Sequence, residues 1–168
     1  MIRLECYRIH DDVTLPQIAT LGSACFDVHA YLKPAVPVTV YGMENKKTEV
    51  MPLDGRIALR PGDRVLVPTG LIFRIPFGTS MRLHARSSVS LKKGLVMPNG
   101  EGIIDSDYYH ETFVMLYNAS ADTVYIEDNE RIAQGELVET TPVDMWETFE
   151  KPSQSTERVG GFGSTGVK

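Results

Sequence analysis

Asn99-Gly100-Glu101-Gly102-Ile103-Ile104-Asp105-Ser106-Asp107-Tyr108 is the stretch around which the rest of the chain is organised. Its two glycines permit a tight turn and let another group approach the backbone closely, because no Cβ is in the way. The apolar pair Ile103-Ile104 places the carboxyl group of Asp105 beside residues that prefer burial. An unpaired buried carboxylate is costly, so Asp105 needs a partner or a task. The stretch alone predicts either a β-hairpin with a polar tip and solvated acids, or a hairpin that presents Asp105 to a ligand.

The composition is that of an ordinary soluble domain and limits the kinds of partner. A chain of 168 residues is long enough to bury the core of one domain. Hydrophobic residues make up 42% and charged residues 23% of the sequence, as in typical globular proteins. The net charge of -5 argues against a general nucleic-acid binder, which is usually basic. A few focused positive groups would still suit an anionic small molecule.

Two features of the sequence bear on location. No apolar run approaches the length of a membrane span, and the first residues, Met1-Ile2-Arg3-Leu4-Glu5-Cys6, do not resemble a signal peptide. The two cysteines, Cys6 and Cys25, lack metal-ligand spacing and could pair only once. We therefore expect a cytoplasmic protein with free thiols and with neither a membrane nor a nucleic acid as partner.

Short apolar segments recur along the chain and are separated by proline and glycine turns. This spacing is typical of strands in an all-β sandwich or barrel. The turn Arg60-Pro61-Gly62-Asp63 has the residues that type II geometry requires. Between Tyr41 and Gly55 the chain makes a polar, hairpin-like excursion whose function the residues do not reveal. The predicted strands cover residues 3–9, 24–30, 56–59, 64–67, 71–76, 81–85, 111–118 and 123–126.

The second predicted strand carries a group of potential metal ligands. Alternation places Asp27 on the same face as Cys25 and His29, with apolar residues on the other face. Residues at i, i+2 and i+4 of one strand spread over about 13 Å, which is too far for three side chains to share one ion. A zinc site made by these three residues alone is therefore excluded.

One segment, Ser87-Ser88-Val89-Ser90-Leu91-Lys92-Lys93-Gly94, interrupts the β pattern. Serines at its start, lysines near its end and a closing glycine predict a single short helix that the serines cap. Arg86 stands immediately before it. Hydroxyls, backbone N–H groups and a guanidinium together favour an anion site. Taken by itself, the segment favours a connector helix whose serines only cap it.

The chain ends in a glycine-rich segment, Glu157-Arg158-Val159-Gly160-Gly161-Phe162-Gly163-Ser164-Thr165-Gly166. Its composition predicts a tail rather than a packed element. A disordered terminus explains the glycines, whereas the arginine and the aromatic residue favour a ligand-binding arm. We divide the chain into a single β domain at residues 1–150 and a C-terminal arm at residues 151–168.

Together these segments resemble the five ordered motifs of the trimeric dUTPase family. Each motif is weak alone, but five in the right order from Ala24 to Gly166 are specific. The resemblance implies an all-β, jelly-roll-like (β-clip) fold with one short helix and a flexible glycine-rich C-terminal arm. The motifs are Ala24-Cys25-Phe26-Asp27-Val28, Arg86-Ser87-Ser88, Gly102-Ile103-Ile104-Asp105-Ser106-Asp107-Tyr108, Arg131-Ile132-Ala133-Gln134 and Gly160-Gly161-Phe162-Gly163-Ser164-Thr165-Gly166.

The family also implies an activity and an assembly. Its members hydrolyse dUTP to dUMP and pyrophosphate with Mg²⁺, which limits uracil in DNA and supplies dUMP for dTMP synthesis. They are homotrimers with shared active sites. By resemblance, Asp105 is the general base that activates the water attacking the α-phosphorus. Asp27 holds Mg²⁺ through coordinated waters, which suits an ion that dehydrates reluctantly.

The resemblance also assigns the substrate contacts. The phosphate ligands would lie at the start of the helix and on a later strand, and backbone groups would read the uracil edge in a slot too tight for a 5-methyl group. Tyr108 would pack under the sugar and exclude a ribose 2′-hydroxyl, and the arm would close over the nucleotide with Phe162 stacked on the base. The implied substrate-binding residues are Arg86, Ser87, Ser88, Asn99, Gly102, Ile103, Ile104, Tyr108, Phe113, Gln134, Arg158, Phe162, Gly163, Ser164 and Thr165.

Three positions depart from the family pattern. Cys25 and Ser88 occupy positions that are commonly glycine. Arg158 lies one residue closer to Phe162 than in the usual arrangement, which puts its phosphate contact in question. The excursion between Tyr41 and Gly55 is also longer than the family core needs.

Two other functions are consistent with parts of the sequence. A dCTP deaminase shares the fold and the Arg-Ser-Ser helix start, but its chemistry needs a glutamate on the strand after the central stretch, where this chain has Met115. A non-catalytic, regulatory β-module would use the exposed excursion as its partner surface. The module would leave Asp105, Gln134 and the glycine-rich tail unexplained together. The sequence therefore favours dUTP hydrolysis.

Overall fold

The computed structural model of the chain describes residues 2–157 and 160. Strands and one short helix form its body, which confirms the all-β prediction. In the described part of the chain, no helix is long and apolar enough to cross a membrane. The elements are β1 (Glu5–Arg8), β2 (Phe26–His29), β3 (Val38–Tyr41), β4 (Lys47–Val50), β5 (Arg56–Leu59), β6 (Arg64–Pro68), β7 (Leu71–Arg74), β8 (Thr79–Ala85), α1 (Ser87–Lys93), β9 (Leu95–Val96), β10 (Gly102–Ile104), β11 (Phe113–Asn118), β12 (Val124–Glu127) and β13 (Arg131–Glu139).

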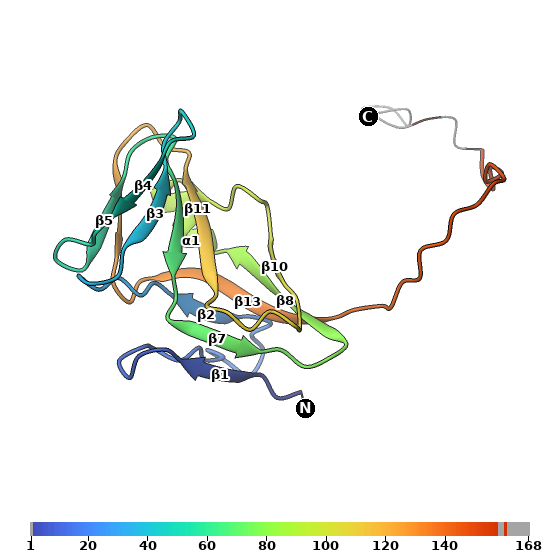
Figure 1. Cartoon of the computed structure of the whole chain (residues 1–168), viewed down its shortest axis with the longest axis horizontal. Coiled ribbons are helices and arrows are strands. Elements are labelled where there is room, and N and C mark those ends of the chain that lie inside the picture. The colour runs from blue at the N-terminus through green and yellow to red at the C-terminus, as the bar shows by residue number, and fades with distance from the viewer. Residues whose placement is uncertain (1, 158–159, 161–168) are drawn as a thin grey trace.

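Two sheets carry most of the fold (Figure 1). One has the strand order β4-β3-β6-β11-β9 and the other has the order β10-β8-β13-β2, while β1-β7 and β12-β5 form two-stranded pairs. Alternating residues of these strands, such as Val28, Leu83, Val67 and Leu116, are almost completely buried in one core. Because alternate side chains of a strand face opposite sides, the remaining positions are free to carry polar groups.

The four-stranded sheet gathers residues that lie far apart in the sequence. Gln134 on β13 is the register partner of Asp27 on β2 and of His84 on β8. Register partners of adjacent strands project to the same face of a sheet. Pairing of β13 with β2 and β8 therefore brings the residues of three motifs side by side.

The turn around Gly100 differs from the predicted β-hairpin. The N–H of Gly100 donates to the carbonyl of Met97 at 3.0 Å, and Gly100 has a φ of +74°, which favours glycine. The flanking strands do not pair with each other, because β9 pairs with β11 and β10 pairs with β8. The prediction of a hairpin is wrong, and the turn instead connects the two large sheets.

The residues after β10 also depart from expectation. The strand ends at Ile104, and residues 105–108 form a turn in which the N–H of Tyr108 donates to the carbonyl of Asp105 at 3.2 Å. Asp107 therefore lies within this turn and not on a strand face. Asp105 is exposed rather than buried, and Ile103 is 57% exposed. The exposed carboxylate of Asp105 therefore needs no charged partner to offset a cost of burial.

The predicted short helix is confirmed, with one correction. It spans Ser87–Lys93 and ends at Gly94, whose φ of 66° is left-handed as expected for a C-terminal cap. The N-cap is Arg86, which makes no side-chain capping hydrogen bond. The serines are therefore not N-caps. Their hydroxyl groups are left without a capping role at the helix start.

The excursion and the arm lie at opposite sides of the body (Figure 1). Strands β3 and β4 pair as the predicted hairpin, but β3 also pairs with β6, so the hairpin extends the five-stranded sheet. Directly after β13, the N–H of Thr140 donates to the carbonyl of Gly78 at 2.9 Å. Residues 141–157 are exposed and contain neither helix nor strand, and in Figure 1 they extend away from the body.

Candidate active site

A cavity of about 330 Å³ lies between the turn that ends in β10 and the strand β11. Seven of the sequence-predicted site residues line this base slot: Asn99, Gly102, Ile103, Ile104, Asp105, Tyr108 and Phe113. The remaining wall is made of Leu66, Leu83, Met97, Thr112 and Met115. The tertiary structure thus brings together, in one mainly apolar cavity, residues from four sequence segments.

The backbone of β10 forms one side of the base slot. This strand is at the edge of its sheet, and no strand of the described chain pairs with its second edge. An edge strand presents free N–H and C=O groups that can bind a ligand. A Cβ on Gly102 would lie 3.0 Å from the Cβ of Leu83, so a side chain at this position would require Leu83 to shift slightly. The amide of Asn99 donates to the carbonyl of Glu101 at 2.9 Å, which fixes its side chain across the turn.

Tyr108 stands at the edge of the slot in a fixed orientation. Its hydroxyl donates to the carbonyl of Glu111 at 2.9 Å, and its ring packs edge-on against His110 with 5.6 Å between ring centroids. The carboxylate of Asp105 lies nearby in the same cavity lining. A planar ligand in the slot would therefore meet backbone groups, an aromatic ring and an acid.

A second group of predicted residues surrounds Asp27. The Oδ1 atom of Asp27 lies 2.8 Å from Nε of Arg86, and its Oδ2 atom lies 3.1 Å from Nη1 of Arg131. The side chains of Asp27 and Arg86 are each 21% exposed, so water reaches this cluster. Two guanidinium groups on one carboxylate fix the position of both arginines and leave the cluster with net positive charge.

Arg131 belongs to this cluster, although the sequence motif that contains it predicted no role for it. It begins β13 in the motif Arg131-Ile132-Ala133-Gln134, opposite His29 in the register with β2. Its position in the motif was the available signal, because only the pairing of β13 with β2 brings its guanidinium to Asp27. Gln134 donates from Nε2 to the carbonyl of Ala85 at 3.2 Å, so it lies beside the chain that leads into Arg86.

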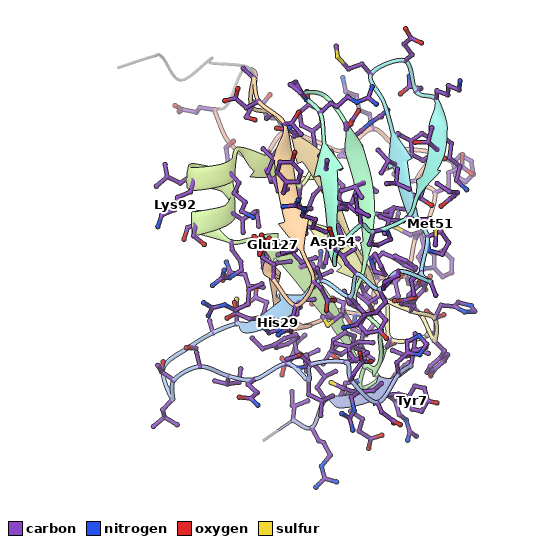
Figure 2. The ribbon with its side chains drawn as sticks, turned by 90° about the vertical axis from the view of Figure 1, so that its left-hand side faces the viewer. Tyr7, His29, Met51, Asp54, Lys92 and Glu127 are labelled. Atoms are coloured by element: carbon purple, nitrogen blue, oxygen red, sulfur yellow. The ribbon has the colours of Figure 1, made fainter. Side chains whose placement is uncertain are left out.

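A basic cavity of about 410 Å³ adjoins this cluster. Its lining includes Arg86, Ser88, Arg131, Lys92 and His29, and Figure 2 shows His29 on β2 and Lys92 on the helix. Burial lowers the pKa of the His29 imidazole, which favours its neutral form. The excess of cationic groups makes the cavity suitable for phosphate.

The two parts of the site lie far apart within one chain. Ile104 pairs with Met81 near the start of β8, so Asp105 lies beside Ser80, whereas Arg86 follows the last residue of β8. At about 3.3 Å per residue, the extended stretch from Ser80 to Arg86 covers about 20 Å. This separation is much longer than a triphosphate group. One chain alone therefore does not place Asp105 and Arg86 on the same triphosphate.

The carboxylate of Asp27 matches one of the ways in which proteins bind Mg²⁺. In the described residues, no group of three or more His, Cys, Asp or Glu side chains could hold a metal ion. Mg²⁺ commonly keeps several waters and binds through one or two carboxylates together with substrate phosphates. The single carboxylate of Asp27 beside the basic cavity fits that mode and does not fit a metal site made of protein ligands alone.

Five predicted residues cannot be placed. Arg158, Phe162, Gly163, Ser164 and Thr165 lie outside the described residues. Their roles in the arm therefore stay predictions.

An apolar slot and a separate cluster of arginines around a carboxylate define the class: an all-β protein with one mainly apolar cavity and one basic cavity. A family model described as dUTPase matches residues 51–166. A deoxyuridine 5'-triphosphate nucleotidohydrolase of Caulobacter vibrioides is 35% identical over 168 residues, which cover 99% of this chain and 94% of the relative. The chain belongs to the dUTPase family, as the motif resemblance predicted.

Solved structures share the fold. A dUTPase from Streptococcus mutans has a TM-score of 0.66 and 28% identity, covering 84% of this chain and 98% of that one. The dUTPase of Staphylococcus bacteriophage 80alpha with dUPNHPP has a TM-score of 0.77 and 21% identity, covering 99% and 100%. A mutant dUTPase of phage phi11 of S. aureus, described with a structural Mg(II) ion, has a TM-score of 0.71 and 17% identity, covering 90% and 100%. The predicted jelly-roll-like fold is confirmed.

Proposed function

We propose that the chain hydrolyses dUTP to dUMP and pyrophosphate, with Asp105 as general base. The observation that carries the proposal is the base slot, in which Asp105 lies in the same lining as the free edge of β10 and the ring of Tyr108. The free backbone edge suits the N3–H and carbonyl groups of uracil. Membership of the dUTPase family supports this substrate.

The reaction needs a base for one proton and positive groups for the departing charge. Asp105 would accept a proton from a water whose oxygen attacks the α-phosphorus. Pyrophosphate would leave as the bond breaks between the α-phosphorus and the oxygen that bridges it to the β-phosphorus. Arg86, Arg131 and the hydroxyls of Ser87 and Ser88 would stabilise the negative charge on the phosphates. Bound Mg²⁺ would neutralise and orient the triphosphate, held through waters by Asp27.

We further propose that the active site is shared between copies in a homotrimer. The support within the chain is the distance of about 20 Å along β8 between the position of Asp105 and that of Arg86. An Asp105 from one copy and an Arg86 from another would meet on one triphosphate.

The proposed physiological role follows from the reaction. Removal of dUTP would limit the incorporation of uracil into DNA, and the dUMP formed would supply dTMP synthesis. Both roles place the protein in the cytoplasm, where deoxynucleotide pools are made.

Val114 and Leu116 face the core on either side of Met115, whose apolar side chain lines the base slot, so nothing there supplies the acid that a dCTP deaminase needs.

The direct test is pyrophosphate release from dUTP, dCTP, dTTP and UTP, measured with and without added Mg²⁺. We expect rapid release from dUTP with Mg²⁺, much slower release after chelation, and little release from the other three nucleotides. Ammonia release from dCTP, measured in parallel, should stay at background. Ammonia from dCTP at a rate comparable to dUTP hydrolysis would instead support the deaminase, and no product from any nucleotide would support the non-catalytic module.

Deletion of the arm from Arg158 onward should lower kcat/KM for dUTP by about 10²-fold or more, because closure over the nucleotide orients the reacting groups and excludes water. The melting temperature and the oligomeric state should stay unchanged, since residues 141–157 are exposed and make no strand with the body. Thermal unfolding and sedimentation of the truncated chain measure both. A truncated protein that loses its oligomeric state would show that the arm is structural.

A further inference from the structure

A second apolar cavity adjoins the base slot through shared side chains. It has a volume of about 280 Å³ and is lined by Tyr41, Asn45, Arg64, Val65, Leu66 and Met115. Leu66 and Met115 also line the base slot. These two side chains therefore form the partition between the slot and this outer compartment.

The partition is a pair of facing residues on neighbouring strands. Leu66 on β6 and Met115 on β11 are register partners, so they project to the same face of the five-stranded sheet. Both are intermediate in exposure, whereas their sequence neighbours Val65, Val114 and Leu116 are buried in the core. The partition thus stands on the outside of the sheet, and truncating it would not open the core.

The outer compartment is bounded by the β3–β4 hairpin. The guanidinium of Arg64 lies over the ring of Tyr41 at 5.9 Å from its centroid. The same guanidinium donates to Oδ1 of Asn45 and, at 3.4 Å, to the carbonyl of Gly42. These contacts fix Tyr41 and Arg64, so the compartment has a defined wall on the side away from the base slot. The family model begins to match only at residue 51, so most of this hairpin lies outside the matched region.

The orientation of the base decides what meets the partition, and this step rests on the proposed function. If the polar O2–N3–O4 edge of uracil binds the free edge of β10, the opposite C5–C6 edge must face away from β10. The slot is also lined by Phe113 and Met115 on β11 and by Leu66 on β6, a strand pair that is not hydrogen-bonded to β10. The C5 position of the base therefore points toward the partition.

We propose that Met115, with Leu66 beside it, is the specificity-determining wall that rejects substituents at C5 of the base. A 5-methyl group would need the space that the Met115 side chain fills. Beyond that side chain lies the outer compartment, so removal of the thioether would connect two existing cavities rather than create a closed void. The chemical class admitted by the opened slot is a 2′-deoxyuridine triphosphate with an apolar 5-substituent.

The test compares Met115→Ala with Met97→Ala, since both methionines line the base slot but only Met115 borders the outer compartment. The substrates are dUTP, dTTP and 5-propynyl-dUTP, whose rigid substituent needs a continuous cavity beyond C5. For Met115→Ala we expect kcat/KM for 5-propynyl-dUTP relative to dUTP to rise at least about tenfold, the scale of discrimination that apolar pockets reach per small group. The same ratio for Met97→Ala should stay at the native value.

Several results separate this inference from the proposed function. If the native chain releases no pyrophosphate from dUTP, the proposed function fails first. If native and Met115→Ala proteins both hydrolyse dUTP but the propynyl ratio is unchanged, the inference is wrong and the function stands. An equal rise in Met97→Ala would also overturn it, because enlargement anywhere would then suffice. Leu66→Ala is the second variant, and it should raise the same ratio; it decides the matter if Met115→Ala fails to fold.

Discussion

Replacing Asp105 by asparagine should reduce the turnover of dUTP by about three orders of magnitude or more while leaving nucleotide binding largely intact. The substitution keeps the shape of the side chain but removes the group that accepts the proton from the attacking water. Asp105 is exposed within one chain and makes no side-chain contact on which folding depends in the described residues, so the fold should be unaffected. Steady-state kinetics and calorimetric binding of a non-hydrolysable dUTP analogue measure the two effects.

The matched control for this substitution is Asp107→Asn. Asp107 lies two residues further along, is also exposed, and does not line the base slot. The same chemical change at Asp107 should alter turnover by less than about threefold, because it removes only a solvated charge. An Asp105→Asn protein with near-native turnover would exclude Asp105 as the general base.

Mixing two inactive variants should restore activity if the site is shared between copies. Arg86→Ala should lower turnover by about 10²-fold or more, because a cationic phosphate contact is lost. When Arg86→Ala and Asp105→Asn chains are unfolded and refolded together in equal amounts, each site draws its Asp105 from one chain and its Arg86 from another. Random assembly then gives about a quarter of the sites both native residues, so about a quarter of the native activity should return.

A second mixture controls for this result. Asp27 and Arg86 contact each other within one chain at 2.8 Å, so they enter a site together. A mixture of Asp27→Asn with Arg86→Ala chains should therefore stay inactive, because every site lacks one of the two residues. Recovery in neither mixture would mean that Asp105 and Arg86 do not act across a chain boundary. Recovery of activity in both mixtures would mean that Asp27 and Arg86 of one chain do not act in the same active site.

Local patterns predicted most elements of the fold. The alternation around Asp27 gave β2 the correct face, since Phe26 and Val28 are buried and Asp27 is not. Gly62 has a φ of +82° at the third position of the predicted type II turn, as Pro61-Gly62 requires. Where the predictions of the fold failed, the cause was that the sequence does not show which strands pair with each other. The glycines near Asn99 do form a turn, but strand pairing with β8 and β11, which a local pattern does not encode, decides that its arms belong to different sheets.

The candidate site was predicted unevenly for a related reason. The motifs named the slot residues, because a short segment supplies most of them. They gave no role to Arg131 and none to the partition of Leu66 and Met115, since each acquires its role only through a neighbour on another strand. Of the two alternatives for Asp105, a solvated carboxylate agrees with its exposure within the chain, because the apolar residues before it lie on an edge strand with one side open.

The stretch from Asn99 to Tyr108, together with the other four motifs, was enough by itself to determine the family and the all-β fold, because order and spacing along the chain are properties of sequence. Only the tertiary structure decided how these segments meet. Hydrogen bonding between strands set Asp27 against Arg86 and Arg131, opened a slot beside β10, and placed Asp105 and Arg86 at opposite ends of β8. The physical reason is that strand register is fixed by long-range burial of alternating side chains, which no short segment contains.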